Sequence, residues 1–307
     1  MSKWVIGVIG GSGLYEIHGL ENAEAVQIET PWGAPSDVLM KGQVGEVEFV
    51  FLPRHGKGHR LTPTHVPYRA NIDALKRLGC TDVLSISACG SLQEQYAPGD
   101  FVMVDQFIDR TFAREKSFFG PGMVAHVSVV EPVCARLSQL AGDAAQAAGA
   151  RTHRGGTYLA MEGPQFSTLA ESRMYREVWG CDVIGMTNMP EAKLAREAEL
   201  CYASVAMITD YDSWHPDHGE VYISDIIATL TGNAGKAKHP KSALQEWAAH
   251  QRRAMPTYQV VERSGPDHAM KFTVEVSIPS LGAAKGTASS KGEAEKRAAE
   301  AFLEEFG

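Results

Sequence analysis

Short β-branched segments alternate with segments of helical periodicity along residues 1–238, and this alternation restricts the fold more than any other feature of the chain. Successive parallel strands need long crossover connections, which are usually helices. The alternation therefore predicts an α/β fold, a mixed and mainly parallel sheet flanked by helices. The expected strands are Trp4–Ile9, Val47–Leu52, Asp82–Ser87, Phe101–Val104, Thr157–Met161, Asp182–Met186 and Ala203–Ile208. The expected helices are Val66–Leu78, Leu169–Trp179 and Pro190–Leu200, and the first two end just before a glycine, which suits a helix C-terminus.

The sequence pattern changes at residues 238–240. The elements expected after this point are a helix over 241–253, strands over 257–263, 271–278 and 283–288, and a helix over 291–305. An α-β-β-β-α order within about 70 residues forms a compact α+β module in its own right. We therefore predict two domains, residues 1–238 and residues 239–307.

Charge is distributed unevenly between these two parts. The chain has 29 Lys and Arg and 37 Asp and Glu, and nine of each kind lie in residues 239–307, so the net charge of −8 belongs to residues 1–238. An acidic surface binds nucleic acid poorly, because affinity for nucleic acid comes mainly from neutralised phosphates. Any nucleic-acid binding must therefore reside in residues 239–307.

The chain has five cysteines and no C-x-x-C pair. An odd number of widely spaced cysteines argues against a disulfide framework and against a zinc site, so we expect reduced, half-buried thiols and no metal. No apolar run reaches the roughly 18 residues that a membrane-spanning helix requires. The first residues lack the pattern of a signal peptide. We expect a cytoplasmic protein with no membrane contact.

Six polar stretches follow predicted strands, which is where open α/β sheets bind ligands. The stretches are Gly10–Gly13, Pro53–Gly56, Ser87–Ser91, Met161–Ser167, Gly185–Thr187 and Thr209–Asp212. Glycines and hydroxyl groups allow the backbone to approach an anion, and an adjacent arginine and histidine can bind phosphate through charge-assisted hydrogen bonds. Asp210 and Asp212 leave a strand at positions i and i+2, so their carboxyl groups point to the same side. Taken singly, such stretches are also compatible with a tight turn, a surface loop or a helix cap, and Cys89 has no base implied by local spacing that would make it a nucleophile.

Taken together, the six stretches resemble the trimeric purine nucleoside phosphorylase superfamily over residues 4–238. The resemblance is carried by Gly10–Gly13, Leu52–Gly56, Ser87–Leu92, Asp105–Thr111, Glu162–Ser167, Met186-Thr187 and Asp210–Trp214. It implies an enzyme, a pentosyltransferase that forms homotrimers. In the implied reaction, inorganic phosphate attacks C1′ of a nucleoside while the bond to the purine breaks. Phosphate is then a co-substrate, and no cofactor or metal is implied.

The resemblance also implies roles for individual residues. The implied phosphate ligands are Ser12, Arg54, His55, Ser87, the backbone of Ala88, and Thr187. The implied nucleoside contacts are Met186 beneath the ribose, Phe166 beside the sugar and base, and Ser167, Asp210 and Asp212 around the purine. Asp210 would share a proton with N7 of the leaving purine, and Asp212 would accept a hydrogen bond from a 6-amino group.

An apolar wall is implied at the 5′ end of the nucleoside, formed by Ile223, Ile226 and Ile227. A methylthio group suits such a wall better than a hydroxyl group does, so the implied substrate is 5′-methylthioadenosine and the implied products are adenine and 5-methylthioribose 1-phosphate. The same isoleucines fit equally well as the inner face of a final helix. Adenosine, inosine and methylthioinosine remain alternative substrates.

Residues 239–307 resemble the double-stranded-RNA-binding domain at the C-terminus of bacterial ribonuclease III. The matching stretches are Lys241–Trp247, Pro256–Tyr258, Val261–His268 and Gly286–Lys291. Such domains read the shape of A-form RNA through two minor grooves and the phosphates between them. The implied RNA contacts are Gln245, Glu246, Pro266, His268, Ser290 and Lys291.

The implied phosphate clamp departs from the family pattern. The chain has Lys291-Gly292-Glu293 where the family usually has consecutive basic residues, so we expect weak RNA binding. Lys296 and Arg297 either compensate in part or belong to a solvated helix face. No acidic ribonuclease signature lies upstream, so RNA cleavage is not expected.

The chain is therefore interpreted as a fusion, of natural or artificial origin, of a nucleoside phosphorylase and an RNA-binding module. The phosphorylase pattern ends early, at residues 233–238, in a region that closes the active site in this superfamily. This truncation keeps a second hypothesis open, in which the first domain is an inactive scaffold and only RNA binding remains. In a trimer, three displayed modules would bind long RNA with avidity.

Overall fold

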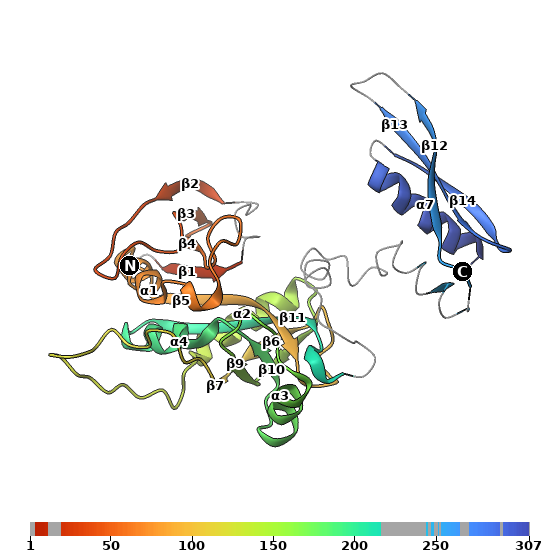
Figure 1. The fold of residues 1–307 in the computed structure, drawn as a ribbon. Helices are drawn as coiled ribbons and strands as arrows, with labels where there is room; N and C mark the ends of the chain where they lie inside the picture. Colours follow the sequence, from red (N-terminus) through yellow and green to blue (C-terminus); the bar gives the residue numbers. More distant parts are fainter. Residues whose placement is uncertain are drawn as a thin grey trace. The chain divides into compact units, whose positions relative to one another are not determined.

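The computed structural model describes residues 4–11, 20–215, 244, 247–248, 251, 253–264, 270–288 and 291–306. The chain divides into two compact units, Met1–Ile226 and Ile227–Gly307 (Figure 1). The domain boundary expected at residue 239 falls between the described ranges, so it stays a prediction.

One large mixed sheet organises the first unit. Its strands within the described residues are β1 (Val5–Gly10), β2 (Glu21–Val26), β3 (Leu39–Val44), β4 (Val47–Pro53), β5 (Asp82–Ser91), β6 (Phe101–Val104), β7 (Gln106–Asp109), β8 (Thr152–Arg154), β9 (Thr157–Ala160), β10 (Val183–Gly185) and β11 (Cys201–Asp210). The central strand β5 pairs in parallel with β1 and β11 and antiparallel with the short β10. β4 pairs in parallel with β1, and β9 pairs in parallel with both β7 and β10. The predicted mixed, mainly parallel sheet is therefore confirmed.

Helices connect the strands of this unit (Figure 1). They are α1 (Tyr68–Arg77), α2 (Ala135–Ala147), α3 (Leu169–Arg173) and α4 (Asn188–Glu197), with a π-helical turn, Met174–Val178, continuing α3. Gly79 and Gly180 follow the first and third of these helical segments with φ of 84° and 63°, the left-handed backbone that only glycine adopts easily. Both glycines therefore end helices as predicted.

The core of the first unit lies along the central strands. Every residue of β1 is buried, and so are Val83 of β5 and Ala206 and Ile208 of β11. Complete burial on both faces is expected for central parallel strands, and it explains why these strands read as continuous apolar runs. The strands that sequence reasoning missed are short or polar, and β2, with the sequence Glu-Asn-Ala-Glu-Ala-Val, is mostly exposed.

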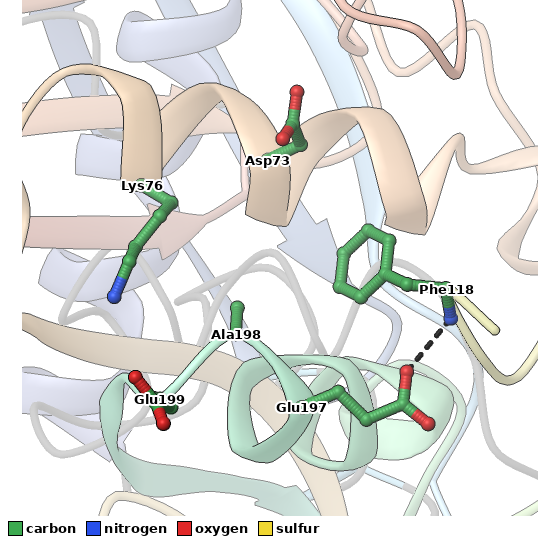
Figure 2. Close-up of a pocket in the computed structure, with 6 residues that line it drawn as sticks. All are labelled: Asp73, Lys76, Phe118, Glu197, Ala198 and Glu199. Atoms are coloured by element: carbon green, nitrogen blue, oxygen red, sulfur yellow. Dashed lines mark hydrogen bonds between the residues drawn. The ribbon is translucent and has the colours of Figure 1, made fainter. Parts of the chain in front are cut away.

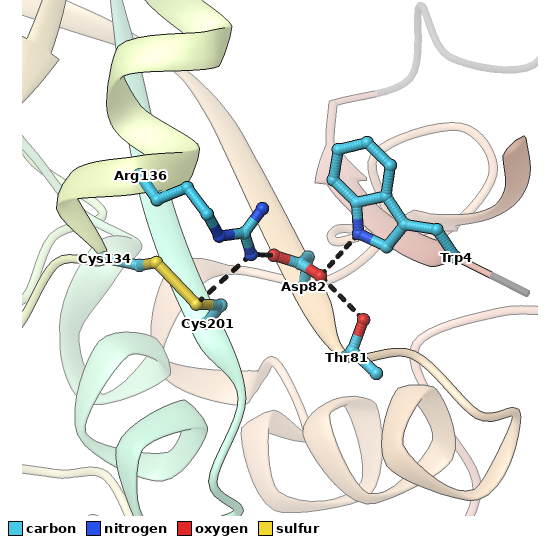
Figure 3. The surroundings of a disulfide bond; sticks show 6 residues. All are labelled: Trp4, Thr81, Asp82, Cys134, Arg136 and Cys201. Atoms are coloured by element: carbon cyan, nitrogen blue, oxygen red, sulfur yellow. Dashed lines mark hydrogen bonds and ion pairs between the residues drawn. A yellow bond between two sulfur atoms is a disulfide. The ribbon is translucent and has the colours of Figure 1, made fainter. Parts of the chain in front are cut away.

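The expectation that all five cysteines are reduced is wrong for one pair. Cys134, just before α2, and Cys201, the first residue of β11, form a disulfide (Figure 3). The two residues are 67 positions apart in the sequence, and packing brings their Cα atoms to 5.2 Å, a separation that a disulfide bridges. Sequence spacing carries no information about such a long-range approach. The other three cysteines, Cys80, Cys89 and Cys181, are free and fully buried.

Beside this disulfide, Figure 3 shows a buried carboxylate with several partners. Asp82 accepts hydrogen bonds of 2.6 Å from both Trp4 Nε1 and Thr81 Oγ1, and it is paired with Arg136. These contacts attach the start of β5 to the segment before β1 and to α2. Across the described ranges no His, Cys, Asp and Glu side chains cluster in a way that could hold a metal ion. No helix there is long and apolar enough to cross a membrane.

The second unit is a three-stranded antiparallel sheet covered by a helix. Its elements are β12 (Thr257–Ser264), β13 (Lys271–Ile278), β14 (Gly282–Ala288) and α7 (Lys291–Phe306). The described residues of the expected helix over 241–253 include Leu244, Trp247 and Ala248, which have helical backbone. Leu244 and Ala248 share a core with Val276 and Phe302. The predicted α+β module is confirmed, and its three strands and last helix lie within one residue of their expected bounds.

Gly286 sets the distance between β14 and α7. A Cβ atom at this position would lie 2.5 Å from the Ala294 carbonyl oxygen and 2.7 Å from the Arg297 carbonyl carbon, both in the backbone of α7. Backbone atoms of a packed helix cannot move aside as the end of a side chain can. The helix therefore sits against the sheet only because glycine occupies residue 286.

We predict that Gly286→Val selectively destabilises the second unit. Overpacking of a core costs typically about 1–3 kcal/mol, and a clash with helix backbone belongs at the upper end. Hydrogen exchange of the full chain should accelerate in peptides covering β12–β14 and stay unchanged in peptides covering β5. Ala283→Val, at an exposed position of the same strand, is the matched control and should exchange like the parent protein. Equal exchange in the two variants would refute the role assigned to Gly286.

Candidate active site

The ends of the central strands bring the predicted phosphate-binding residues together. β1, β4, β5 and β11 run parallel, so their C-terminal ends meet at one edge of the sheet. Arg54 directly follows β4, and its backbone N–H donates to Gly10 O at the end of β1, over 2.9 Å. This edge is where open α/β sheets bind ligands.

Arg54 is a buried cation with a matched buried anion. Its Nε donates to Glu191 Oε2 over 2.8 Å, and its second terminal nitrogen donates to Ser85 Oγ over 2.7 Å and to Glu191 Oε1 over 3.2 Å. Both members of the ion pair have only 2% of their side chain exposed. Although burial opposes the charge, attraction to Glu191 raises the pKa of Arg54 above its usual range. The guanidinium is therefore permanently charged and fixed in orientation.

His55 is neutral at pH 7. Burial, and then the charge of Arg54, lower the pKa of His55 to about 4. Its Nδ1 lies 2.9 Å from Leu61 O. Because a carbonyl oxygen only accepts hydrogen bonds, Nδ1 carries the proton of the neutral ring and Nε2 carries the lone pair. His55 therefore offers an acceptor, which suits an oxyanion that still bears a proton.

Hydroxyl and amide groups continue this polar region along β5 and into α4. Asn188 donates from Nδ2 to Ser85 Oγ over 2.9 Å, and its Oδ1 accepts from Ser87 Oγ over 3.4 Å. Thr187 and Ser87 are both buried. Ala88, which lies between the buried Ser87 and Cys89 in β5, is exposed. The predicted phosphate ligands Arg54 and Ser87 thus belong to one hydrogen-bonded group that is centred on Ser85 and Asn188. Thr187 directly precedes Asn188, and its backbone N–H donates to Tyr158 Oη over 3.4 Å.

The two predicted purine-reading carboxylates lie side by side at the end of β11. Asp210 Oδ1 accepts from the Asp212 backbone N–H over 2.8 Å, and Asp210 Oδ2 accepts from Thr209 Oγ1 over 2.7 Å. A Cβ atom on the neighbouring Gly90 would lie 2.9 Å from Asp210 Oδ1 and 3.2 Å from Asp212 Cβ. Gly90 therefore provides the space in which the pair fits against β5.

Asp212 has an altered affinity for protons. Burial raises the pKa of Asp212 to about 6, with a further rise from the neighbouring charge of Asp210, against the lowering effect of hydrogen bonds from Ser172, Ser213 and Ser167. The Ser172 hydroxyl donates to Asp212 Oδ2 over 2.5 Å. Asp212 is thus ionised at pH 7 and becomes protonated only slightly below it.

The segment that carries Phe166 and Ser167 approaches these carboxylates. Ser213 Oγ donates to Ser167 O over 2.7 Å, which joins this segment to the turn after Asp212. Met186 packs against the same segment at Gly163. The contact is so close that a Cβ atom on Gly163 would collide with Met186 Sδ. Phe166 is 39% exposed, so its aromatic ring is available to a ligand. The structure therefore brings the described residues that were predicted to contact the nucleoside to the same edge of the sheet as the predicted phosphate ligands.

Several predicted residues lie outside the described ranges. They are Ser12 of the phosphate site, Ile223, Ile226 and Ile227 of the apolar wall, and Gln245, Glu246, Pro266, His268 and Ser290 of the RNA-binding site. Their roles stay predictions.

Sequence reasoning missed two buried charged groups that support the site, Glu191 and Arg114. Glu191 balances Arg54, and Arg114 pairs with Glu162 over 3.0 Å. Glu162 belongs to the predicted stretch Met161–Ser167, but its carboxylate already accepts hydrogen bonds from Thr64, Phe112 N, Ala113 N and Arg114. Burial alone would raise the pKa of Glu162, but these hydrogen bonds outweigh burial and lower the pKa to about 2. A buried arginine needs a carboxylate partner, because an unpaired buried charge is costly. This rule implies that Arg54 has an acidic partner, but it does not say which residue that partner is.

Cys89 does not act as a nucleophile in this arrangement. It is fully buried in β5, and burial raises the pKa of its thiol to about 12. A thiol that stays protonated at pH 7 is a poor nucleophile. The structure thus agrees with the sequence-based argument against a catalytic cysteine.

A pocket in the described part of the first unit lies away from this site. It is lined by Asp73, Lys76, Phe118, Glu197, Ala198 and Glu199, as Figure 2 shows. The Glu197 carboxylate there accepts from Phe118 N over 2.7 Å and from Ser117 Oγ over 2.7 Å. Among the described residues, none of those predicted to bind a ligand lines this pocket, so it is separate from the described part of the candidate active site.

In the second unit, the described part of the predicted RNA-binding site is the start of α7. Lys291 has 61% of its side chain exposed, and its Nζ lies 3.7 Å from Glu295 Oε1. Arg297 donates to Thr287 O over 2.8 Å. The lysine at this helix terminus is therefore accessible, but a nearby carboxylate competes for its charge.

Two family models match the chain, one for each part. The model described as the phosphorylase superfamily matches residues 5–239. The model described as the double-stranded RNA binding motif matches residues 240–305.

Individual relatives are similar to the first part. The S-methyl-5′-thioadenosine phosphorylase of Cereibacter sphaeroides is 69% identical over 236 residues, which are 77% of this chain and 81% of the relative. The S-methyl-5′-thioadenosine phosphorylase of Bradyrhizobium diazoefficiens is 60% identical over 238 residues, which are 78% and 81%. Among solved structures, the methylthioadenosine phosphorylase from Schistosoma mansoni in complex with adenine is 40% identical with a TM-score of 0.72, covering 76% of this chain and 88% of that chain.

Proposed function

Because the chain belongs to the phosphorylase superfamily, we propose that it catalyses the phosphorolysis of 5′-methylthioadenosine to adenine and 5-methylthioribose 1-phosphate. The observation that carries the proposal is one edge of the sheet at which a permanent cation, Arg54 after β4, and two adjacent carboxyl groups, Asp210 and Asp212 at the end of β11, both lie. Relatives at 69% and 60% identity named for this nucleoside support the choice of substrate.

In the proposed reaction, a phosphate oxygen bonds to C1′ as the bond from C1′ to N9 of the purine breaks. Arg54 supplies positive charge to the attacking phosphate, while Ser12, Ser87, Thr187 and the Ala88 backbone orient it. Neutral His55 accepts a hydrogen bond from the P–OH group of a phosphate monohydrogen dianion, and the proton stays on the phosphate. Phosphate is the co-substrate, and the reaction needs no cofactor.

On the other side of C1′, the purine leaves with a developing negative charge. Asp210 shares a proton with N7 and so stabilises the leaving group. Asp212 accepts from the 6-amino group, Phe166 and Ser167 flank the base, and Met186 contacts the ribose. Ile223 and Ile227 form the apolar wall for the methylthio group.

The test is adenine release from 5′-methylthioadenosine with and without added inorganic phosphate. The proposal requires release that depends strictly on phosphate and yields equal amounts of adenine and the sugar phosphate. Release without phosphate would indicate a hydrolase. No release from folded protein would favour the alternative in which the first unit is an inactive scaffold.

The raised pKa of Asp212 predicts that base selectivity depends on pH. At pH 7.5 the group is mostly a carboxylate, which accepts from a 6-amino group. At pH 5.5 it is mostly protonated and can donate to a 6-oxo group. A mismatched buried polar group costs about 1–3 kcal/mol, so the kcat/KM ratio of methylthioinosine to methylthioadenosine should rise about fivefold or more between these pH values.

This ratio cancels effects that the two substrates share, including the protonation of phosphate. Asp212→Asn has no group that titrates in this range, so its ratio should be constant across the same pH interval. A ratio that rises equally in the variant and the parent protein would assign the pH dependence to another group.

We further propose that the first unit assembles as a homotrimer. The segment between β7 and α2 leaves large apolar side chains exposed, with Phe112 82%, Met123 69%, Val124 74% and Val130 78% exposed. Large apolar side chains that are exposed together on one segment are typical of an interface. Sedimentation equilibrium should give three times the chain mass, whereas a monomer at micromolar concentration would refute the proposal. The cytoplasmic location stays a prediction.

The second unit is proposed to bind double-stranded RNA weakly. The supporting observations are its match to the RNA binding motif and the exposed Lys291 at the start of α7. Fluorescence anisotropy should show binding to a 20-base-pair RNA duplex, none to the DNA duplex of the same sequence, and tighter binding per site to a much longer RNA. Lys291→Ala should weaken binding and reduce its salt dependence. Equal affinity for RNA and DNA would contradict recognition of the A-form.

A further inference from the structure

Arg114 lies in the segment after β7 and is fully buried, with 0% of its side chain exposed. Its guanidinium reaches three separate parts of the first unit. Nε donates to the Glu162 carboxylate over 3.0 Å, and one terminal nitrogen donates to Tyr68 Oη of α1 over 2.9 Å. The remaining hydrogen bonds go to backbone carbonyl groups. No role in ligand binding explains a side chain placed in this way.

The carbonyl groups that Arg114 contacts belong to two turns. Its terminal nitrogens donate to Glu162 O over 2.7 Å and to Met161 O over 3.3 Å, just after β9. They also donate to Met186 O and, over 2.7 Å, to Met189 O, in the turn that leads from β10 into the start of α4, where Met189 itself has non-helical backbone. Buried carbonyl groups at the end of a strand have lost their partners in the sheet and need another donor. Arg114 supplies that donor to both turns at once.

These two turns carry residues of the candidate active site. The turn after β9 leads to Phe166 and Ser167, and the turn after β10 contains Met186 and Thr187. β9 and β10 pair only from Val183 to Gly185, so the ladder stops at the point where the turns begin. Beyond it, the side chain of Arg114 fixes the distance between the predicted sugar contact and the predicted base contacts.

We propose that Arg114 is a positioning residue, which holds these two turns at the separation that phosphorolysis requires without touching either substrate. This inference rests on the proposed function of the site. The planar guanidinium matches the task, because its donors point in fixed directions toward several acceptors, whereas a lysine has one donor atom. Glu162 completes the arrangement, since its carboxylate binds Arg114 and the backbone N–H groups of residues 112 and 113.

The test compares Arg114→Lys with Lys116→Met. Lys116 lies two residues further along the same segment and also makes an ion pair, with Asp109 over 3.0 Å, and a bond to a carbonyl group, Thr111 O, over 2.6 Å. It contacts neither turn through these bonds, so it reports what loosening this segment does by itself. Both variants are assayed well below their unfolding temperatures, with circular dichroism showing that they are folded.

A misplacement of about 1 Å can cost roughly 100-fold in rate. Arg114→Lys should therefore lower kcat at least tenfold with the KM for phosphate changed much less, because Arg54 and its ion pair stay intact. Lys116→Met should keep kcat within twofold of the parent protein. Normal kcat in folded Arg114→Lys would overturn the proposal, and so would an equal loss in both variants.

Hydrogen exchange tests whether Arg114 holds the two turns in place, and this measurement does not depend on enzymatic activity. Peptides covering 161–168 and 186–190 should exchange faster in Arg114→Lys than in the parent protein, while Lys116→Met leaves them unchanged. Unchanged exchange in Arg114→Lys would overturn the proposal even in an inactive protein. Absence of phosphate-dependent adenine release from the parent protein would instead count against the proposed function, so the two failures are distinguishable.

Discussion

Replacing Arg54 with methionine is expected to remove stability and activity together. The variant leaves the Glu191 carboxylate buried without its cation, although Ser85 and Tyr202 still donate to it over 2.5 and 2.9 Å. Breaking a buried ion pair by removing one partner costs about 3–5 kcal/mol. Loss of the cation also removes the proposed attraction for phosphate. Urea unfolding should report the first effect, and the KM for phosphate the second.

A double variant separates these two effects. Arg54→Met with Glu191→Gln has no uncompensated charge, and the glutamine oxygen can still accept from Ser85 and Tyr202. We expect it to regain more than half of the lost free energy of unfolding while phosphorolysis stays at least 100-fold below that of the parent protein, since the anion then meets no charge. Recovery of activity in the double variant would show that Arg54 serves the fold alone.

A matched surface pair provides the control. Arg154 and Asp143 are 2.6 Å apart, with 44% and 58% of their side chains exposed. Exposed pairs contribute about 0–1 kcal/mol, so Arg154→Met should change neither the free energy of unfolding by more than that nor the KM for phosphate. A large loss of stability in this variant would mean that the first unit tolerates few arginine substitutions, and the Arg54 result would then lose its meaning.

The fold was predictable where a strand is buried on both faces, because such a strand has a continuous run of apolar residues. β1 is such a case, and so is β11. β2 and β8 were not predicted because they lie at or near the margin of the sheet and have polar sequences. The disulfide between Cys134 and Cys201 was missed for a related reason, since spacing rules describe neighbours in the sequence and this pair meets only after α2 packs on β11.

The candidate site was predictable to the extent that its residues are proposed to contact ligands directly. Arg54, Asp210 and Asp212 belong to short stretches whose residue types express the chemistry of phosphate and purine. Glu191 and Arg114 act through other residues, and their partners lie 137 and 48 positions away in the sequence. From sequence alone, a glutamate in the first turn of a helix, such as Glu191, is expected to be solvent-exposed. Its burial becomes evident only when the packing of the helix is known. Residues that support a site are therefore visible only once the tertiary contacts are known.

Asp210→Asn is expected to lower kcat about 100-fold, and Asp210→Ala by up to about 10,000-fold, because proton transfer by a positioned side chain contributes roughly that range. Asparagine keeps an oxygen for the Asp212 backbone N–H and can donate a hydrogen bond to N7, but it cannot transfer a proton to it. Alanine can neither accept the hydrogen bond from the Asp212 backbone nor donate one to N7. The measurement is single-turnover adenine release at saturating phosphate, with Asp143→Asn, at an exposed position, as a control that should match the parent protein.

An N7-methylated nucleoside distinguishes proton transfer from a structural role of Asp210. Its purine leaves as a neutral molecule, because the methyl group already provides the positive charge that protonation of N7 would supply. If Asp210 acts through N7, the ratio of parent to variant kcat should fall from about 100 toward unity with this substrate, since the contribution of proton transfer is no longer available to either protein. A structural defect, such as loss of the hydrogen bond that holds Asp212 over 2.8 Å, would slow both substrates equally. An unchanged ratio would therefore reassign Asp210 from the chemistry to the support of Asp212.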